Sequence, residues 1–152
     1  KKQMKKLISF IMAFAMVLTM SAGAFAYHNE PQVTVTTEDW GDGITAVVTT
    51  TVYENTYARS YTTKPANRTW NIYDNGTAIG SMTLNVNFSY NGTTAKVASY
   101  TSSHTTKSGW SYKNEYISAS GGTCTISADF ASSSKTIYAR KSISCSATGV
   151  IS

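Results

Sequence analysis

The chain has 152 residues, which is enough for one domain, and a formal net charge of +5. Four of its 13 basic residues are lysines at its start, Lys1, Lys2, Lys5 and Lys6. Without them nine basic and eight acidic residues remain, a net charge of +1. Nucleic-acid binding needs Lys and Arg clustered on one face. The nine are scattered along the sequence, so the composition argues against a nucleic-acid partner.

Residues 1–26 have the pattern of a signal peptide. The lysines precede an apolar run from Leu7 to Met20, and Ala24-Phe25-Ala26 supplies a small-x-small cleavage site. The run is shorter than the roughly 20 apolar residues that a membrane span needs, although an uncleaved anchor is the alternative. We therefore expect a secreted protein, free of the membrane after cleavage, whose single domain spans residues 27–152.

The remaining sequence is rich in Thr, Ser, Tyr, Val and Ile and contains no convincing amphipathic helix. Strand-like runs recur with turn signals between them, at a spacing typical of a sandwich or barrel. The predicted strands are 33–38, 44–53, 57–62, 68–73, 78–90, 93–101, 110–118, 122–130 and 136–146. We expect loops at 64–67 and 102–109. The sequence thus predicts an all-β fold, a single antiparallel β-sandwich of Ig-like architecture with eight or nine strands.

Three carboxylates lie close together where the first predicted strand turns. Glu38, Asp39 and Asp42 fall within five residues, and oxygen ligands of this kind suit Ca²⁺. Their order does not fit an EF-hand loop, and Asp beside Gly is ordinary turn chemistry. We favour the turn and expect neither a metal nor a cofactor.

Aromatic residues are frequent between positions 53 and 73. In a continuous strand, Tyr53, Tyr57 and Tyr61 would share one face and could stack on sugar rings. A turn at Glu54-Asn55 would instead return Tyr57 and Tyr61 to the core, where aromatic residues pack across strands. The candidate ligand-binding residues are Tyr57, Tyr61, Trp70 and Tyr73.

Strict alternation of apolar and polar residues over 82–90 indicates a strand with one buried face. Asn91-Gly92 follows, and this pair favours a two-residue type I′ turn. Such a turn would place Phe88 opposite Ala95.

A second Asn-Gly pair, Asn75-Gly76, predicts another two-residue hairpin, with Ile72 opposite Ile79. Ile79 and Met82 then differ in parity, so the alternation must shift between them. Gly80 is the predicted place, as a bulge or a bend.

The two cysteines lie in the last two predicted strands. Pairing Phe130 with Ala139 would place Cys124 opposite Cys145, which suits a cross-strand disulfide in an exported protein. Two buried thiols are the alternative. An inward strand position argues against a catalytic cysteine.

The second half of the chain carries a resemblance. Its residues are Phe88-Ser89-Tyr90-Asn91-Gly92, Trp110, Ser120-Gly121-Gly122 and the run from Ser144 to Ser152. Residues 80–152 resemble small secreted β-rich proteins of anaerobic Gram-positive bacteria whose function is unknown. Members of this group often have a Cys in the strand after the Tyr-Asn-Gly turn, where this chain has Ala95 and Val97. The matching residues form turns and core positions, so the resemblance implies a fold and no activity.

Motifs of catalysis are absent from the sequence. It contains no Gly-x-Ser-x-Gly elbow, no phosphate-binding Gly-rich loop before a helix and no Cys/His cluster with zinc spacing. Ser132 to Lys135 matches Ser-x-x-Lys, but in a serine-rich turn such a match arises by chance. The eight acidic residues left after the signal lie mostly in turns, which does not suggest a glycosidase pair. We expect no enzyme.

We predict instead a secreted, non-catalytic binding module for cell-wall or host glycans, or for a cell-surface protein. Exposed Tyr, Trp and Asn side chains would form its site. The alternative is a structural or self-associating protein, including a toxin-like one, that acts through strand edges. Exposed aromatic residues within 53–73 would favour the first function, and a long, unprotected edge strand would favour the second.

Overall fold

The computed structural model describes residues 30–53 and 62–152. The predicted signal peptide, residues 1–26, lies outside the described residues, as do Tyr57 and Tyr61. The described strands are β1 (Gln32–Gly41), β2 (Ile44–Val52), β3 (Thr62–Asp74), β4 (Thr77–Tyr90), β5 (Ala95–Thr106), β6 (Ser111–Ser120), β7 (Thr123–Ala131) and β8 (Thr136–Ser144). Within this part of the chain no helix is long and apolar enough to cross a membrane.

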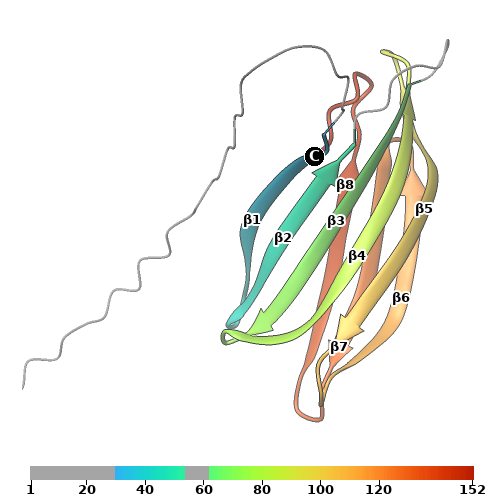
Figure 1. Cartoon of the computed structure of the whole chain (residues 1–152). Helices are drawn as coiled ribbons and strands as arrows, with labels where there is room; N and C mark the ends of the chain where they lie inside the picture. The colour runs from blue at the N-terminus through green and yellow to red at the C-terminus, as the bar shows by residue number, and fades with distance from the viewer. Residues whose placement is uncertain (1–29, 54–61) are drawn as a thin grey trace, which may run out of the picture.

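The strands form two antiparallel sheets, one in the order β1-β2-β3-β4-β5 and the other in the order β6-β7-β8 (Figure 1). The prediction of an all-β fold with two layers is therefore confirmed. Within each sheet, every strand pairs with its neighbours in sequence, so both sheets are meanders. The two sheets of an immunoglobulin domain are instead interleaved along the chain. Among the described strands that Ig-like connectivity is not seen.

The sheets bury a shared core because apolar residues alternate along the strands that face each other. β2, β3 and β4 contribute to it from the large sheet, and β7 and β8 from the small one. Its largest side chains are Trp70, Phe88 and Phe130, each at most 1% exposed. The outer strands β1, β5 and β6 contain no fully buried residue. Half-buried rings such as Trp40 and Tyr112 instead pack against the edges of the core.

The predicted shift of alternation in β4 is confirmed, although the predicted pair of Ile72 with Ile79 does not form. Tyr73 pairs with Ala78 and Ile72 with Gly80, so Ile79 is the extra residue of a bulge beside Gly80. A Cβ atom at position 80 would collide with the Thr105 carbonyl and the Phe130 ring of the other sheet. Glycine is therefore required at this contact between the two sheets.

The two Asn-Gly hairpins differ. Asn75 and Gly76 both have positive φ, 47° and 80°, and form the predicted two-residue turn between Asp74 and Thr77. The prediction for Asn91-Gly92 is wrong, because Tyr90 pairs with Ala95 across a four-residue turn.

The side chain of Asn91 explains the longer turn. Its Oδ1 accepts hydrogen bonds from the backbone N–H groups of Thr93, at 3.0 Å, and Thr94, at 2.8 Å. Asparagine side chains commonly organise turns in this way. Phe88 consequently pairs with Val97 rather than with Ala95.

Two predicted loops are strands. Residues 64–67 belong to β3 although they include Pro65, whose carbonyl accepts a hydrogen bond from Tyr53 N at 3.0 Å. Pro65, which has no N–H, therefore faces Tyr53, just beyond the end of β2. Its missing N–H costs few hydrogen bonds between β2 and β3 there. Most of residues 102–109 also belong to β5, which continues to Thr106 as an exposed outer strand.

The predicted register of β7 and β8 is wrong by two residues. Phe130 pairs with Ile137 because the connecting turn has only four residues, closed by a bond from Ser132 N to Lys135 O at 2.8 Å. Ile143, and not Cys145, therefore lies opposite Cys124. The predicted Cys124–Cys145 disulfide is absent, and both cysteines are buried free thiols. Burial raises the pKa of each thiol.

We expect both thiols to resist modification in the folded protein, because a buried thiol with a raised pKa forms little thiolate. Ellman's reagent should react slowly with native protein and should detect two sulfhydryls per chain after unfolding without reductant. Finding no sulfhydryl in the unfolded protein would establish a disulfide and contradict this register.

Candidate functional site

Two of the predicted ligand-binding residues lie on opposite faces of β3. Trp70 points into the core and is 1% exposed, so it cannot stack on a ligand as predicted. Tyr73 is half-buried and points outward, because successive residues of a strand alternate. The structure therefore does not bring Trp70 and Tyr73 together in one aromatic platform.

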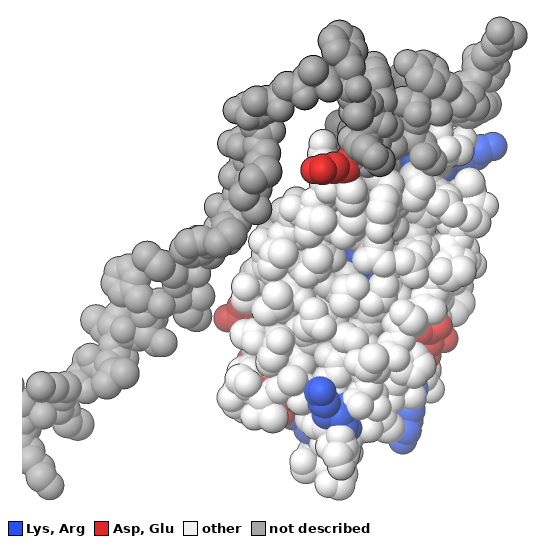
Figure 2. All heavy atoms as spheres, in the orientation of Figure 1, with Lys and Arg blue, Asp and Glu red and all other residues white. Residues whose placement is uncertain are grey.

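Hydroxyl and amide side chains cover the outer surface of the large sheet. We call this surface the polar face, and its members are Asn67, Thr69, Ser81, Thr83, Asn85, Asn87, Ser99, Thr101 and Thr105. β2 and β4 contain no charged residue, and the charged residues of β3 point away from this surface. Figure 2, viewed from the side of the large sheet, shows a surface that is almost entirely free of charge.

Hydrogen bonds connect the side chains of the polar face across three strands. Asn67 Nδ2 donates to Asn85 Oδ1, and Asn85 Nδ2 donates to Thr101 Oγ1 at 3.3 Å. Beside this chain, Asn87 Nδ2 donates to Ser99 Oγ at 2.9 Å. Each amide has two donors and one acceptor oxygen, so these bonds orient the amides and leave further hydrogen-bonding capacity.

A shallow depression of about 140 Å³ lies over this row of amides. Its lining includes Asn67, Asn85 and Asn87 together with Tyr53 and Tyr100. Tyr53 is 44% exposed. Tyr100 is 43% exposed but pairs with Val86 of the core, so its ring projects to the other side of the sheet. The depression thus combines one accessible aromatic side chain, Tyr53, with oriented amides. Tyr53 belongs to the aromatic stretch that the sequence singled out, and the three asparagines were missed as site residues.

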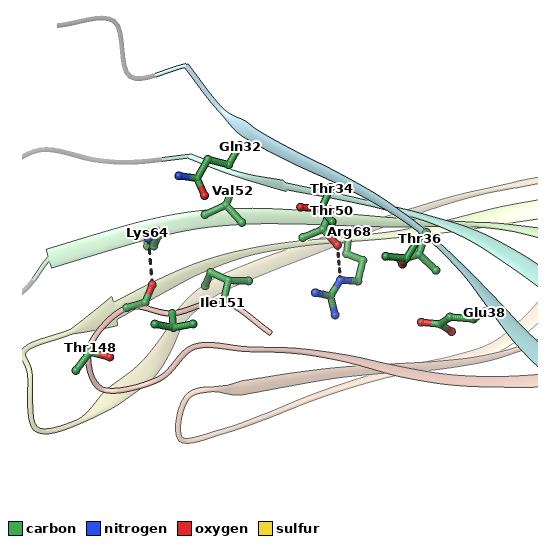
Figure 3. Close-up of a pocket in the computed structure, with 13 residues that line it drawn as sticks. Gln32, Thr34, Thr36, Glu38, Thr50, Val52, Lys64, Arg68, Thr148 and Ile151 are labelled. Carbon is green, nitrogen blue, oxygen red and sulfur yellow. Dashed lines mark hydrogen bonds between the residues drawn. The ribbon is translucent and has the colours of Figure 1, made fainter. Parts of the chain in front are cut away.

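A larger cleft of about 520 Å³ lies at the other side of the same sheet, between the inner surface of β1 to β3 and the C-terminal segment. We call it the side cleft. Thr34 and Thr36 of β1 face it and remain exposed, although they are on the side of the sheet that carries the core. Figure 3 shows β1 along one wall and the C-terminal segment, with Thr148 and Ile151, along the other. Val48 and Val52 of β2 add apolar surface to the lining.

Cations from β3 bridge the two walls of the side cleft. Arg68 donates from Nε to Thr50 Oγ1 at 2.8 Å and from Nη1 to the Ser142 carbonyl at 3.0 Å. Lys64 donates to the Gly149 carbonyl at 3.1 Å (Figure 3). Burial lowers the pKa of Arg68, and the charge of Glu38 opposes that shift. The guanidinium stays protonated, because an arginine pKa starts far above neutrality.

An ion pair closes the lower end of the side cleft. Lys141 Nζ lies 2.5 Å from Glu38 Oε2 and 4.3 Å from the centroid of the Trp40 ring. Trp40 Nε1 donates to the same carboxylate oxygen at 2.7 Å. Burial opposes ionisation of Glu38, but the hydrogen bonds from Lys141 and Trp40 outweigh it and lower the pKa of the carboxyl.

The other two carboxylates of this turn do not join Glu38 around a metal site. Asp39 accepts a hydrogen bond from Gly41 N at 2.8 Å, which is turn chemistry. Within residues 30–53 and 62–152, no group of three or more His, Cys, Asp and Glu side chains is arranged to hold a metal ion.

Comparison of this chain with protein-family models, with curated proteins and with solved structures finds no match. The resemblance of residues 80–152 to secreted proteins of Gram-positive bacteria therefore stays a prediction.

Sequence reasoning missed both Arg68 and Lys141 as site residues. Lys141 interrupts the inward-facing apolar residues of β8, and that interruption was the available signal, because a charged residue on the inner face of a strand needs a partner. The partner lies 103 residues earlier, on β1, and the sequence does not show which strands face each other.

We expect Glu38 to make folding depend on pH. Its folded pKa is lowered, so its stabilising effect is present above about pH 4.3, the unfolded glutamate pKa, and is lost as pH falls through the folded value. Glu38→Gln should therefore lower the free energy of unfolding at pH 7, by less than about 1 kcal/mol for this partly exposed pair. The difference from wild type should shrink at lower pH in urea titrations.

A double-mutant cycle with Lys141→Met provides the control. If the ion pair is responsible, adding Glu38→Gln to Lys141→Met should cost less than Glu38→Gln alone. Equal costs in the two backgrounds would show that Lys141 is not the relevant partner.

Proposed function

We propose that this protein is a secreted, non-catalytic binding module for neutral glycans, and that the depression of the polar face is its site. The observation that carries the proposal is the row of cross-bonded asparagines beside the exposed Tyr53, on a surface that is almost entirely free of charge. Ligands such as cell-wall or host polysaccharides match this surface in chemistry.

Three properties of the surface support a glycan ligand. Amide and hydroxyl groups both donate and accept hydrogen bonds, as sugar hydroxyls do. Tyrosine rings offer large, rigid contact area at a small entropic cost. The asparagine side chains are held by one another before any ligand arrives, which lowers the cost of ordering them on binding.

The proposal predicts that purified protein co-sediments with insoluble neutral polysaccharides. Asn85→Ala should weaken binding, because it breaks the hydrogen-bonded row and removes groups that face the ligand. Each lost hydrogen bond is worth about 0.5–1.5 kcal/mol, so the affinity should fall by about two- to tenfold. Tyr53→Ala should weaken binding as well, through loss of contact area.

The chain offers a matched control. Thr101→Ala and Thr125→Ala each remove a hydroxyl that bonds across strands, but Thr125 belongs to the small sheet, where its partner is Ser142. Only Thr101→Ala should affect binding. Equal losses in the two variants, or no binding to any neutral polymer, would count against the proposal.

One observation favours the alternative, a self-associating protein. β1 is an edge strand with no charge from Gln32 to Thr37, and its Val33 and Val35 are 56% and 55% exposed. Unprotected edges of this kind pair with other strands.

If β1 mediates association, size-exclusion chromatography with light scattering should detect dimers or larger species. Val35→Lys should dissociate them, because a lysine on an edge strand opposes pairing. Monomeric wild-type protein at high concentration would exclude this function and leave the glycan proposal untouched.

A further inference from the structure

The side cleft is a second enclosed surface, separate from the polar face and opposite to it in electrostatic character. The members of the polar face are uncharged. The lining of the side cleft, in contrast, includes two cations, Lys64 and Arg68, and one carboxylate, Glu38. That carboxylate interacts electrostatically with Arg68 but forms its ion pair with a third cation, Lys141, so cations outnumber carboxylates here. The cleft is therefore net positive.

The position of Arg68 fits the recognition of an anionic group. Its Nε and Nη1 hold the Thr50 hydroxyl and the Ser142 carbonyl, which fixes the plane of the guanidinium. Nη2 makes no hydrogen bond to any of the residues that the structure describes. Figure 3 shows the guanidinium extending from β3 into the space between β1 and the C-terminal segment. A fixed guanidinium with donors still available is well suited to bind a carboxylate.

The rest of the lining fits a saccharide. Gln32, Thr34 and Thr36 present an amide and two hydroxyls from β1, and Val52 and Ile151 offer small apolar surfaces for the face of a sugar ring. The volume of about 520 Å³ lies within the range of about 300–1,000 Å³ that is usual for ligand clefts.

We propose that the side cleft binds an acidic saccharide, with the carboxylate of a uronic acid held by Arg68 and the sugar hydroxyls held by the threonines of β1. This site is independent of the neutral-glycan site on the polar face. An acidic polysaccharide would then be recognised at one sheet edge and a neutral one on the flat surface.

The test uses isothermal titration calorimetry of the full protein with trigalacturonic acid and with its methyl ester. The acid should bind and the ester should not, because the ester cannot form the ion pair. Binding should weaken as NaCl is raised. A short peptide with a free C-terminal carboxylate serves as a third probe, and binding of this peptide in preference to the acid would overturn the saccharide assignment.

Two variants of equal charge locate the site. Arg68→Gln should weaken binding of the acid by about ten- to a hundredfold, the loss expected for a charge-assisted hydrogen bond. Arg140→Gln changes net charge equally on the outer surface of β8, and it should leave affinity within about twofold because no charge in the cleft changes. Equal effects of the two variants, or equal binding of acid and ester, would overturn the proposal.

Arg68 also connects the two sheets, so a variant that keeps it is needed in case Arg68→Gln does not fold. The double variant Thr34→Val, Thr36→Val removes two hydroxyls from the cleft while keeping side-chain shape and strand propensity. The double variant should lower the affinity for trigalacturonic acid by about two- to tenfold. Thr37→Val, on the opposite face of β1, should leave the affinity unchanged. Unchanged affinity in the double variant would contradict the proposed contacts. Neutral-glycan binding at the polar face should persist throughout, so failures of the two proposals are distinguishable.

Discussion

The unequal width of the two sheets governs the rest of the structure. Five strands lie against three, and on the β5 side the sheets are joined by the short turn from Lys107 to Trp110 and by the stacking of His104 on Tyr112 at 3.9 Å. On the opposite side β1 contains no fully buried residue, and β8 reaches it through the pair of Lys141 with Glu38. The inner surface of β1 is not buried by another strand, and its residues are polar. The side chains of Glu38, Trp40, Arg68 and Lys141 fill part of the space beside it. The side cleft is the part that stays open.

The two candidate surfaces follow from this arrangement in different ways. The polar face is the solvated side of a wide sheet, where rows of Thr, Ser and Asn satisfy one another across strands. The side cleft exists because a sheet of five strands cannot be covered by one of three. Its cations contribute twice, since the same Arg68 that joins β3 to the Ser142 carbonyl also gives the cleft its positive charge. Arg68 therefore contributes both to the contact between the two sheets and to the positive charge of the side cleft.

The sequence predicts the strands well because alternation is strong in β2, β4, β7 and β8, which form the core. The sequence does not predict the register where a side chain determines the length of a turn, as Asn91 does. A shift of two residues keeps the same residues facing the core but changes every cross-strand pair. This is also why the disulfide was predicted, because the register that placed Cys124 opposite Cys145 satisfied the same pattern as the true one. The candidate site was predicted less well. The sequence does not show whether Trp70 faces the core or solvent, and the asparagines of the polar face lie on two strands, β3 and β4, whose register only the fold reveals.

The meander order of both sheets bears on how the chain reaches this fold. Within each sheet, strands that pair are adjacent in sequence, so their pairing is local and the entropic cost of closing the connections is small. Docking of the small sheet on the large one is the long-range step, and it brings Phe130 onto Gly80 and the ammonium of Lys141 onto β1. Proteins dominated by local pairing fold faster than those with interleaved sheets. A nascent chain of this kind can therefore complete its first sheet before the last three strands have emerged, with only the inner face of that sheet awaiting its partner.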